Sequence, residues 1–279
     1  MGETETTMEK LNNFIYDHSF TVLFLCISLF YCIVMIIGLI LKYTTKIDVA
    51  GDNLYSSHIF SAISMLFSIL GGLLLVGVND TYNAASDAVT KEAQYLINLF
   101  KNVGLLGEPV ATKIRKHLYN YAINVAEKEY SDMELGKEPI AGWLSLQKAF
   151  AELINFKPEG LQETFALNNT ITMYDNLTMS RKDRILIAQS SLSNLLYIIM
   201  ISMSIFMVLI LCFFEIKSLS YHIFMLILII INVSLLISII KYLDKPFRGI
   251  GLTLDKTAIE YTINRMRAIN KIDLIKTTD

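Results

Sequence analysis

The sequence predicts an all-α membrane protein with four transmembrane helices, a cytoplasmic helical domain between spans 2 and 3, and a C-terminal cytoplasmic helix. Its residues are 53% hydrophobic and 18% charged, whereas soluble domains usually carry about 25% charged residues. Four uncharged apolar runs are long enough to cross a hydrocarbon core, which takes roughly 20 helical residues. Elsewhere the apolar residues recur at helical spacing, and strand-like alternation is nowhere sustained.

The four apolar runs are the predicted membrane spans. A helix that is apolar on every side is best covered by lipid. The segment before the first run is acidic, and the run is too long for the apolar part of a cleavable signal, so we expect a retained anchor. The predicted spans are 19–41, 59–78, 195–214 and 221–240.

The basic residues predict the orientation. Four spans place both termini and the long segment between spans 2 and 3 on one side of the membrane. That side holds all but three (Lys42, Lys46 and Lys217) of the 24 Lys and Arg residues, and basic residues are enriched on the cytoplasmic side. We therefore expect a multi-pass protein of the plasma (inner) membrane with both termini cytoplasmic. The predicted parts are the cytoplasmic N-terminus (1–18), spans 1 and 2 (19–78), the cytoplasmic helical domain (79–194), spans 3 and 4 (195–240) and the cytoplasmic C-terminal helix (241–279).

Glycine and proline residues predict three breaks in the cytoplasmic domain, at 104–109, 136–139 and 157–158, which divide it into about four helices. The first of these helices continues span 2 without a break signal. Its apolar stripe contains a carboxylate, and a buried carboxylate is costly unless it is paired. The stripe consists of Ala85, Val89, Glu92, Leu96, Leu99 and Val103.

We interpret Glu92 as one half of a buried ion pair that fixes helix register. A ligand or ion contact and an edge-exposed side chain are the alternatives. Arg115, Arg184 and Arg248 are candidate partners that the sequence does not rank, and we take Glu92 and Arg184 as the structural ion pair.

Other charged groups of this domain have simpler interpretations. The segment 181–184 lies shortly before span 3, and we interpret it as a positive-inside anchor in preference to an anion site. An acidic cluster lacks the residue order and central glycine of an EF-hand loop, so we expect a solvated helix end. The cluster consists of Glu127, Glu129, Asp132, Glu134 and Glu138.

The C-terminal helix is roughly amphipathic. We expect it to dock on the cytoplasmic domain of its own chain in preference to a neighbouring subunit. Its predicted apolar face consists of Leu254, Ala258, Tyr261, Ile263, Met266 and Ile269.

Span 2 is the candidate functional element because one of its faces is small and hydroxyl-bearing. Alternating spacings of four and three keep these residues on one side of a helix. Either close helix packing or a water-filled pore formed where several copies meet explains such a stripe. The span holds no charged ring, so ion selectivity would come from hydroxyls, backbone dipoles and dehydration. The candidate pore-lining residues are Ser57, Ser61, Ser64, Ser68, Gly72 (or the adjacent Gly71), Leu75 as a constriction and Asn79 at the mouth.

Several functions are disfavoured by the sequence. A net charge of −2 gives no general attraction to nucleic acid. The three cysteines lie in apolar runs, and no His pair has metal-ligand spacing along one helix. We therefore expect no enzyme activity, no metal site, no cofactor and no nucleic-acid partner.

Three phrases in order along the chain resemble the bestrophin-like membrane proteins. They are Tyr82 with Glu92–Ala93 ten residues later, Arg181-x-x-Arg184 before span 3, and Asp244–Lys–Pro246–Phe247–x–Gly249 after span 4. The resemblance covers nearly the whole chain. It implies distant similarity to bestrophins, which are pentameric anion channels with a pore lined by the second span and an apolar neck. The sequence departs from this pattern in two ways. The hydroxyl-bearing face of span 2 offers mainly Leu75 for an apolar neck, with Val76 beside it. The acidic calcium clasp of animal bestrophins has no recognisable counterpart.

Two functional hypotheses follow. The first is a homo-oligomer, expected to be a homopentamer in the lipid bilayer, that conducts anions such as chloride passively and with weak selectivity through a pore lined by span 2. The second is a membrane-anchored scaffold whose cytoplasmic helical domain binds a protein partner.

Overall fold

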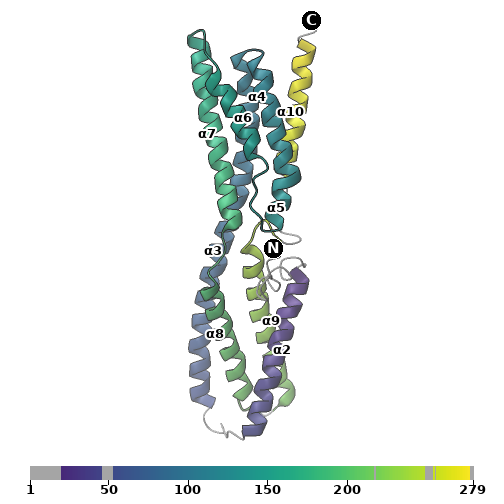
Figure 1. Cartoon of the computed structure of the whole chain (residues 1–279). Coiled ribbons are helices and arrows are strands. Elements are labelled where there is room, and N and C mark those ends of the chain that lie inside the picture. The colour runs from purple at the N-terminus through teal and green to yellow at the C-terminus, as the bar shows by residue number, and fades with distance from the viewer. Residues whose placement is uncertain (1–19, 46–52, 217, 249–253, 255, 277–279) are drawn as a thin grey trace, which may run out of the picture. The chain divides into compact units, whose positions relative to one another are not determined.

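The structure, a computed structural model, describes residues 20–45, 53–216, 218–248, 254 and 256–276 (Figure 1). These described residues form helices and contain no strand, which confirms the predicted all-α class. They belong to two compact units. Unit 1 takes its residues from 1–82, 191–245 and 249–252, and unit 2 from 83–190, 246–248 and 253–279. The predicted N-terminal segment 1–18, Lys46, Lys217 and Gly249 lie outside the described residues.

Unit 1 contains four helices that are long and apolar enough to cross a membrane, as predicted. Helix α2 packs against both α8 and α9. Between α2 and α8 the buried phenol of Tyr31 hydrogen-bonds to the hydroxyl of Ser204, and such contacts join helices where water is excluded. The helices are α2 (Phe20–Thr45), the first part of α3 (Asn53–Asn102), α8 (Asn194–Phe213) and α9 (Leu219–Leu243).

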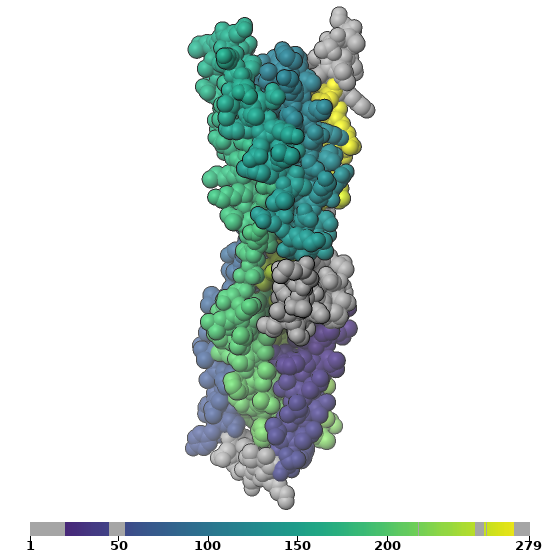
Figure 2. Space-filling view, in the orientation of Figure 1, coloured from purple at the N-terminus to yellow at the C-terminus, as the bar shows by residue number. Residues whose placement is uncertain are grey.

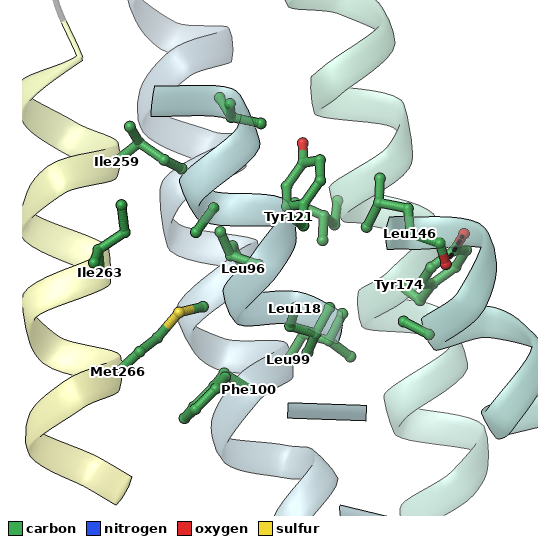
Figure 3. Close-up of a cluster of buried hydrophobic side chains, with 14 of the residues drawn as sticks. Leu96, Leu99, Phe100, Leu118, Tyr121, Leu146, Tyr174, Ile259, Ile263 and Met266 are labelled. Carbon is green, nitrogen blue, oxygen red and sulfur yellow. Dashed lines mark hydrogen bonds between the residues drawn. The ribbon is translucent and has the colours of Figure 1, made fainter. Parts of the chain in front are cut away.

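Unit 2 is a bundle of helices around its own apolar core (Figure 3). The loops between its helices coincide with the three breaks that glycine and proline predict. Its elements are the second part of α3, η1 (Val103–Leu106), α4 (Val110–Asn124), the π-helical turn η2 (Val125–Glu129), α5 (Tyr130–Glu134), α6 (Trp143–Asn155), α7 (Leu161–Gln189) and α10 (Thr257–Lys276).

Helix α3 is one uninterrupted helix of 50 residues that contributes to both units. The sequence predicts this continuity because no break signal follows span 2. Within unit 2 every residue of its predicted stripe is buried, from Ala85 through Glu92 to Val103. Leu96, Leu99 and Glu92 therefore belong to the same interior face.

Helix α10 docks on its own chain, as predicted, against α4 and the π-helical turn. Ile259, Ile263 and Met266 point into the core of unit 2 (Figure 3). The predicted face is wrong at Tyr261, which is 62% exposed, because the buried face is centred one residue further on, at Thr262.

Candidate functional site

Within unit 1, α3 presents three different faces. One face packs into the unit through Phe67, Leu74 and Val78, all of which are buried. A second face is apolar but exposed, and the third carries the small and hydroxyl-bearing residues. The exposed apolar side chains are Met65, Leu66, Ile69, Leu73 and Val76.

The predicted pore-lining residues lie mainly on the outside of unit 1. The other spans of the same chain do not cover this face, so in a membrane it meets lipid, another subunit or water. The exposed amide of Asn79 finds few polar partners in lipid, which favours another subunit or water. Exposed members are Ser61, Ser68, Gly72 and Asn79, and half-buried members are Ser57, Ser64 and Leu75.

Three serine hydroxyls of this face donate hydrogen bonds within their own helix. Ser57 donates to the carbonyl of Leu54 at 2.7 Å, Ser61 to that of Ser57 at 2.8 Å, and Ser68 to that of Ser64 at 2.8 Å. Each hydroxyl has one hydrogen to donate, and the carbonyl already accepts it, so that hydrogen is not available to an anion. The oxygen lone pairs are not used by these bonds. Ser64 differs, because its Oγ is buried and has no hydrogen-bond partner in the described part of the chain.

Two adjacent glycines serve different surfaces of α3. A Cβ at Gly71 would lie 2.6 Å from Cδ2 of Leu236, so the side chain of Leu236 on α9 lies directly against α3 at this point. A Cβ at Gly72 would meet no atom within 4 Å. Gly72 therefore belongs to the open face, and Gly71 belongs to the packing face.

The bulky residues at the end of the stripe also differ. Leu75 is half-buried and packs against the core of unit 1. Val76 is 60% exposed. Leu75 is thus poorly placed to form a constriction outside the protomer, and Val76 belongs to the exposed apolar face.

A second candidate site is a buried charged cluster in unit 2. Arg184 on α7 contacts Glu92 on α3 through Nε and Oε2 at 2.5 Å, and Glu129 through Nη2 and Oε2 at 2.7 Å. Arg181 pairs with Glu129 and donates to the carbonyl oxygen of Pro139 at 2.9 Å. Two carboxylates and two guanidinium groups balance in charge, as buried ions require.

Of the three candidate partners, the structure places Arg184 against Glu92. Arg115 instead donates from Nε to the carbonyl of Phe100 at 3.2 Å. Arg248 donates from Nε to the carbonyl of Glu134 at 3.1 Å.

The π-helical turn positions Glu129 in this cluster. A π turn holds more residues than an α turn and often occurs at functional sites. Oε1 of Glu129 also accepts a hydrogen bond from the N–H of Gly142 at 2.8 Å. A Cβ at Gly142 would lie 2.8 Å from the buried ring of Tyr121, so the loop approaches this closely only because a glycine is present.

Two interpretations based on the sequence are wrong here. Glu129 is 0% exposed, so it does not belong to a solvated helix end. Arg181 and Arg184 are 7% and 0% exposed, so they pair with carboxylates inside unit 2 and do not act as a positive-inside anchor. The two arginines can be buried because Glu92 and Glu129, on other elements of unit 2, compensate their charges.

The sequence contains a pattern that could have identified Glu129, Arg181 and Arg184 as buried. Leu118, Ala122, Val125 and Glu129 recur at spacings of four, three and four, and all are buried. The buried stripe of α7 continues in the same way into both arginines. These are the patterns that singled out Glu92 on α3.

Tyr121 and Arg184 titrate far from their ordinary range. Tyr121 donates its O–H to Glu92, and burial, followed by the charge of Glu92, raises the pKa of its phenol well above 10. Burial lowers the pKa of Arg184, but the charge and hydrogen bond of Glu92 outweigh it and raise this pKa well above its ordinary value. Arg184 is therefore permanently charged, and Tyr121 is a neutral donor. We interpret the cluster as the element that joins α3, the π-helical turn and α7.

Metal ligation receives no support from the described residues, among which no group of three or more His, Cys, Asp and Glu side chains could hold an ion. Cys26 is exposed, Cys32 is half-buried and Cys212 is buried.

Four apolar spans and helices throughout the described residues define this chain as a helical multi-span membrane protein. The Bestrophin-like domain model matches residues 27–251. The chain therefore belongs to the Bestrophin-like family, and the resemblance noted in the sequence is confirmed.

Crystal structures of a bacterial bestrophin homolog from Klebsiella pneumoniae have the same fold. The form solved by Zn-SAD phasing aligns with a TM-score of 0.66 at 14% identity, over 87% of this chain and 96% of that one. Two point variants give TM-scores of 0.67 and 0.68 at 14% and 15% identity, each over 87% of this chain, and over 98% and 94% of their own chains. A search of curated proteins finds no match.

Proposed function

We propose that this chain is the subunit of a homopentameric channel in the plasma (inner) membrane, with both termini cytoplasmic, that conducts anions passively and with weak selectivity. One observation carries the proposal: the small and hydroxyl-bearing face of α3 lies outside the chain's own bundle, at Ser61, Ser68, Gly72 and Asn79. Membership of the Bestrophin-like family supports it.

The three faces of α3 suit a pore helix. The face with Phe67 and Leu74 anchors the helix in its own subunit. The exposed apolar face, which includes Leu66 and Leu73, then meets a neighbouring subunit or lipid. The remaining face is the one that copies arranged around an axis would turn toward shared water.

Weak selectivity follows from the chemistry of this face. It carries no formal charge, so no strong field is present to select among anions. The hydroxyls of Ser57, Ser61 and Ser68 already donate to backbone carbonyls. Each would have to give up that bond to solvate an anion, which reduces the net gain.

Chloride flux from liposomes tests the proposal. In a background in which the three native cysteines are alanine, Ser61→Cys, Ser68→Cys and Asn79→Cys should lose most of their flux on reaction with a charged, water-soluble methanethiosulfonate. Leu66→Cys and Leu73→Cys, on the exposed apolar face of the same helix, are matched controls that should keep it.

One result contradicts the channel, and a second contradicts the proposed lining of its pore. Purified protein shown to be oligomeric could give no more flux than protein-free liposomes, in which case the scaffold hypothesis becomes the better one. Equal inhibition of both sets of variants would show that α3 does not turn this face toward the pathway.

A further inference from the structure

A shallow, open groove on the surface of unit 2 has the volume of a small-molecule site. Its volume is about 530 Å³, within the roughly 300–1,000 Å³ that is typical of ligand pockets. Trp143 at the start of α6 and a stretch of α7 line it, and both helices form part of the visible surface in Figure 2. The lining residues used below are Trp143, Asp175, Met179, Arg181, Lys182 and Leu186.

Arg181 gives the groove unused hydrogen-bond donors. Its side chain is 8% exposed, and both of its hydrogen bonds, to Glu129 and to the carbonyl of Pro139, are donated by Nη2. Its Nε is buried and has no partner in the described part of the chain. Nε is too buried for a ligand to reach, but Nη1 donates no hydrogen bond to the residues that the structure describes, so an acceptor oxygen that meets Nη1 in the groove would be favourable.

The walls of the groove are apolar and the ends are charged. Trp143, Met179 and Leu186 are 46%, 66% and 53% exposed, and the Arg181 guanidinium lies 5.9 Å from the centre of the Trp143 ring. Exposed Lys182 stands beside Arg181 on α7. Asp175 lies two turns earlier, roughly 10 Å along the helix at about 1.5 Å per residue.

We propose that this groove binds a small organic monoacid with an aromatic or branched apolar body. The acid group lies at the Arg181 and Lys182 end, where charge-assisted hydrogen bonds are strongest. The body packs against Trp143, Met179 and Leu186. Asp175 at the other end repels a second negative charge, so diacids of similar length bind more weakly.

Among the described residues, the C-terminal helix does not cover the groove. Helix α10 packs against α4 and the π-helical turn. The unused donors of Arg181 and the adjacent Lys182 favour an anionic ligand over an uncharged protein surface. A neighbouring subunit in the groove is an outcome that the experiment detects.

The intrinsic fluorescence of Trp143 reports directly on the groove, because Trp143 is the single tryptophan of the chain. Full-length protein in lipid nanodiscs is titrated with phenylacetate at constant ionic strength. We expect a saturable change in emission with a dissociation constant on the order of a millimolar, given a ligand of this size. 2-Phenylethanol, which has the same body without the acid, should bind at least tenfold more weakly.

Variants separate the site from general charge effects. Lys182→Gln at the exposed end should weaken phenylacetate binding about two- to fivefold, as expected for one partly screened charge. Met179→Glu should abolish binding by placing a negative charge in the groove. Lys148→Gln, at an exposed lysine on α6 that does not line the groove, is the matched control and should bind like the parent protein.

Three results overturn the proposal. Phenylacetate could leave Trp143 emission unchanged, or 2-phenylethanol could bind equally well. Alternatively, Trp143 could be shielded from acrylamide quenching in the oligomer and become accessible only when the oligomer is dissociated, which would assign the groove to a subunit interface. Chloride flux is not a readout here, so each of these results leaves the channel proposal unaffected.

Discussion

At the scale of single residues, unit 2 depends on how its buried charges are matched. Glu92 is 2% exposed and Arg184 is 0% exposed, and each removes the cost of burying the other. Replacing such a pair with apolar residues is often tolerated, whereas removing one partner leaves an isolated buried charge. Removing the second partner as well should therefore offset part of the loss that the first substitution causes.

Arg184→Met should lower the free energy of unfolding by about 3–5 kcal/mol, because Glu92 loses its cation and Glu129 loses one of two. Adding Glu92→Gln should restore part of this loss, since the isolated charge is then gone. Denaturant unfolding in detergent measures both. Lys113→Met is the control, because its contact with Glu152 at 3.8 Å is largely exposed and should be worth less than about 1 kcal/mol. A loss at Arg184 no larger than that at Lys113 would contradict the argument.

Tyr121 predicts a dependence of stability on alkaline pH. Its pKa is raised in the folded state, so its contribution to stability is complete below the unfolded value near 10 and is lost as the pH rises above it. Tyr121→Phe should be less stable at pH 8 by about 1–3 kcal/mol through loss of the bond to Glu92. Between pH 10 and 11 the free energy of unfolding should fall in both proteins. The fall should be smaller in Tyr121→Phe than in the parent, by up to about 1.4 kcal/mol. Denaturant unfolding at several pH values measures the free energy of unfolding of each protein. Tyr261→Phe, at an exposed phenol, is the control. Parallel pH curves for Tyr121→Phe and the parent would refute the prediction.

The sequence identified one half of this cluster and missed the other for a physical reason. Glu92 interrupts an obvious apolar stripe on a long regular helix, so its burial could be predicted. Glu129 also continues a buried stripe, but it lies among acidic neighbours that are mostly exposed, and this acidic cluster concealed its burial. The contact of Gly142 with Tyr121 depends on loop geometry, which residue spacing does not encode.

At the scale of elements, the two adjacent glycines of α3 separate packing from conduction. Gly71→Leu should destabilise unit 1 by about 1–3 kcal/mol, because the new side chain overlaps Leu236 on α9. Gly72→Leu should keep the fold and lower chloride flux, because its side chain enters the open face. Thermal stability and size-exclusion profiles assess the fold, and liposome flux assesses conduction. The argument fails if both variants unfold alike, or if Gly72→Leu conducts like the parent.

The positions of the helices were largely predictable because local residues, mainly glycine and proline, determine where a helix ends. Glycine and proline break the helices of unit 2 at the predicted loops, and the lack of either after span 2 lets α3 run on. The face that α10 buries was less predictable. Tyr261 and Thr262 are both compatible with an amphipathic helix, but Thr262 is buried, where its hydroxyl donates to the carbonyl of Ala93 on α3 at 3.4 Å, and Tyr261 is exposed.

At the scale of the whole molecule, four spans without charge and one polar face on α3 limit how the proposed channel can discriminate among ions. Anions that enter such a pore are stabilised by dipoles alone, so the cost of removing their water dominates. Large, weakly hydrated iodide should therefore permeate better than bromide, and bromide better than chloride. Anion-exchange flux in liposomes, with each halide at equal concentration, measures the order. Asn79→Asp, which adds a negative charge at the end of the open face, should reduce permeation of all three halides and leave their order intact, whereas Asp80→Asn, at an exposed neighbour off the stripe, should alter flux far less. A parent protein that passes chloride faster than iodide would require a strong-field anion site, and the described face of α3 does not contain one.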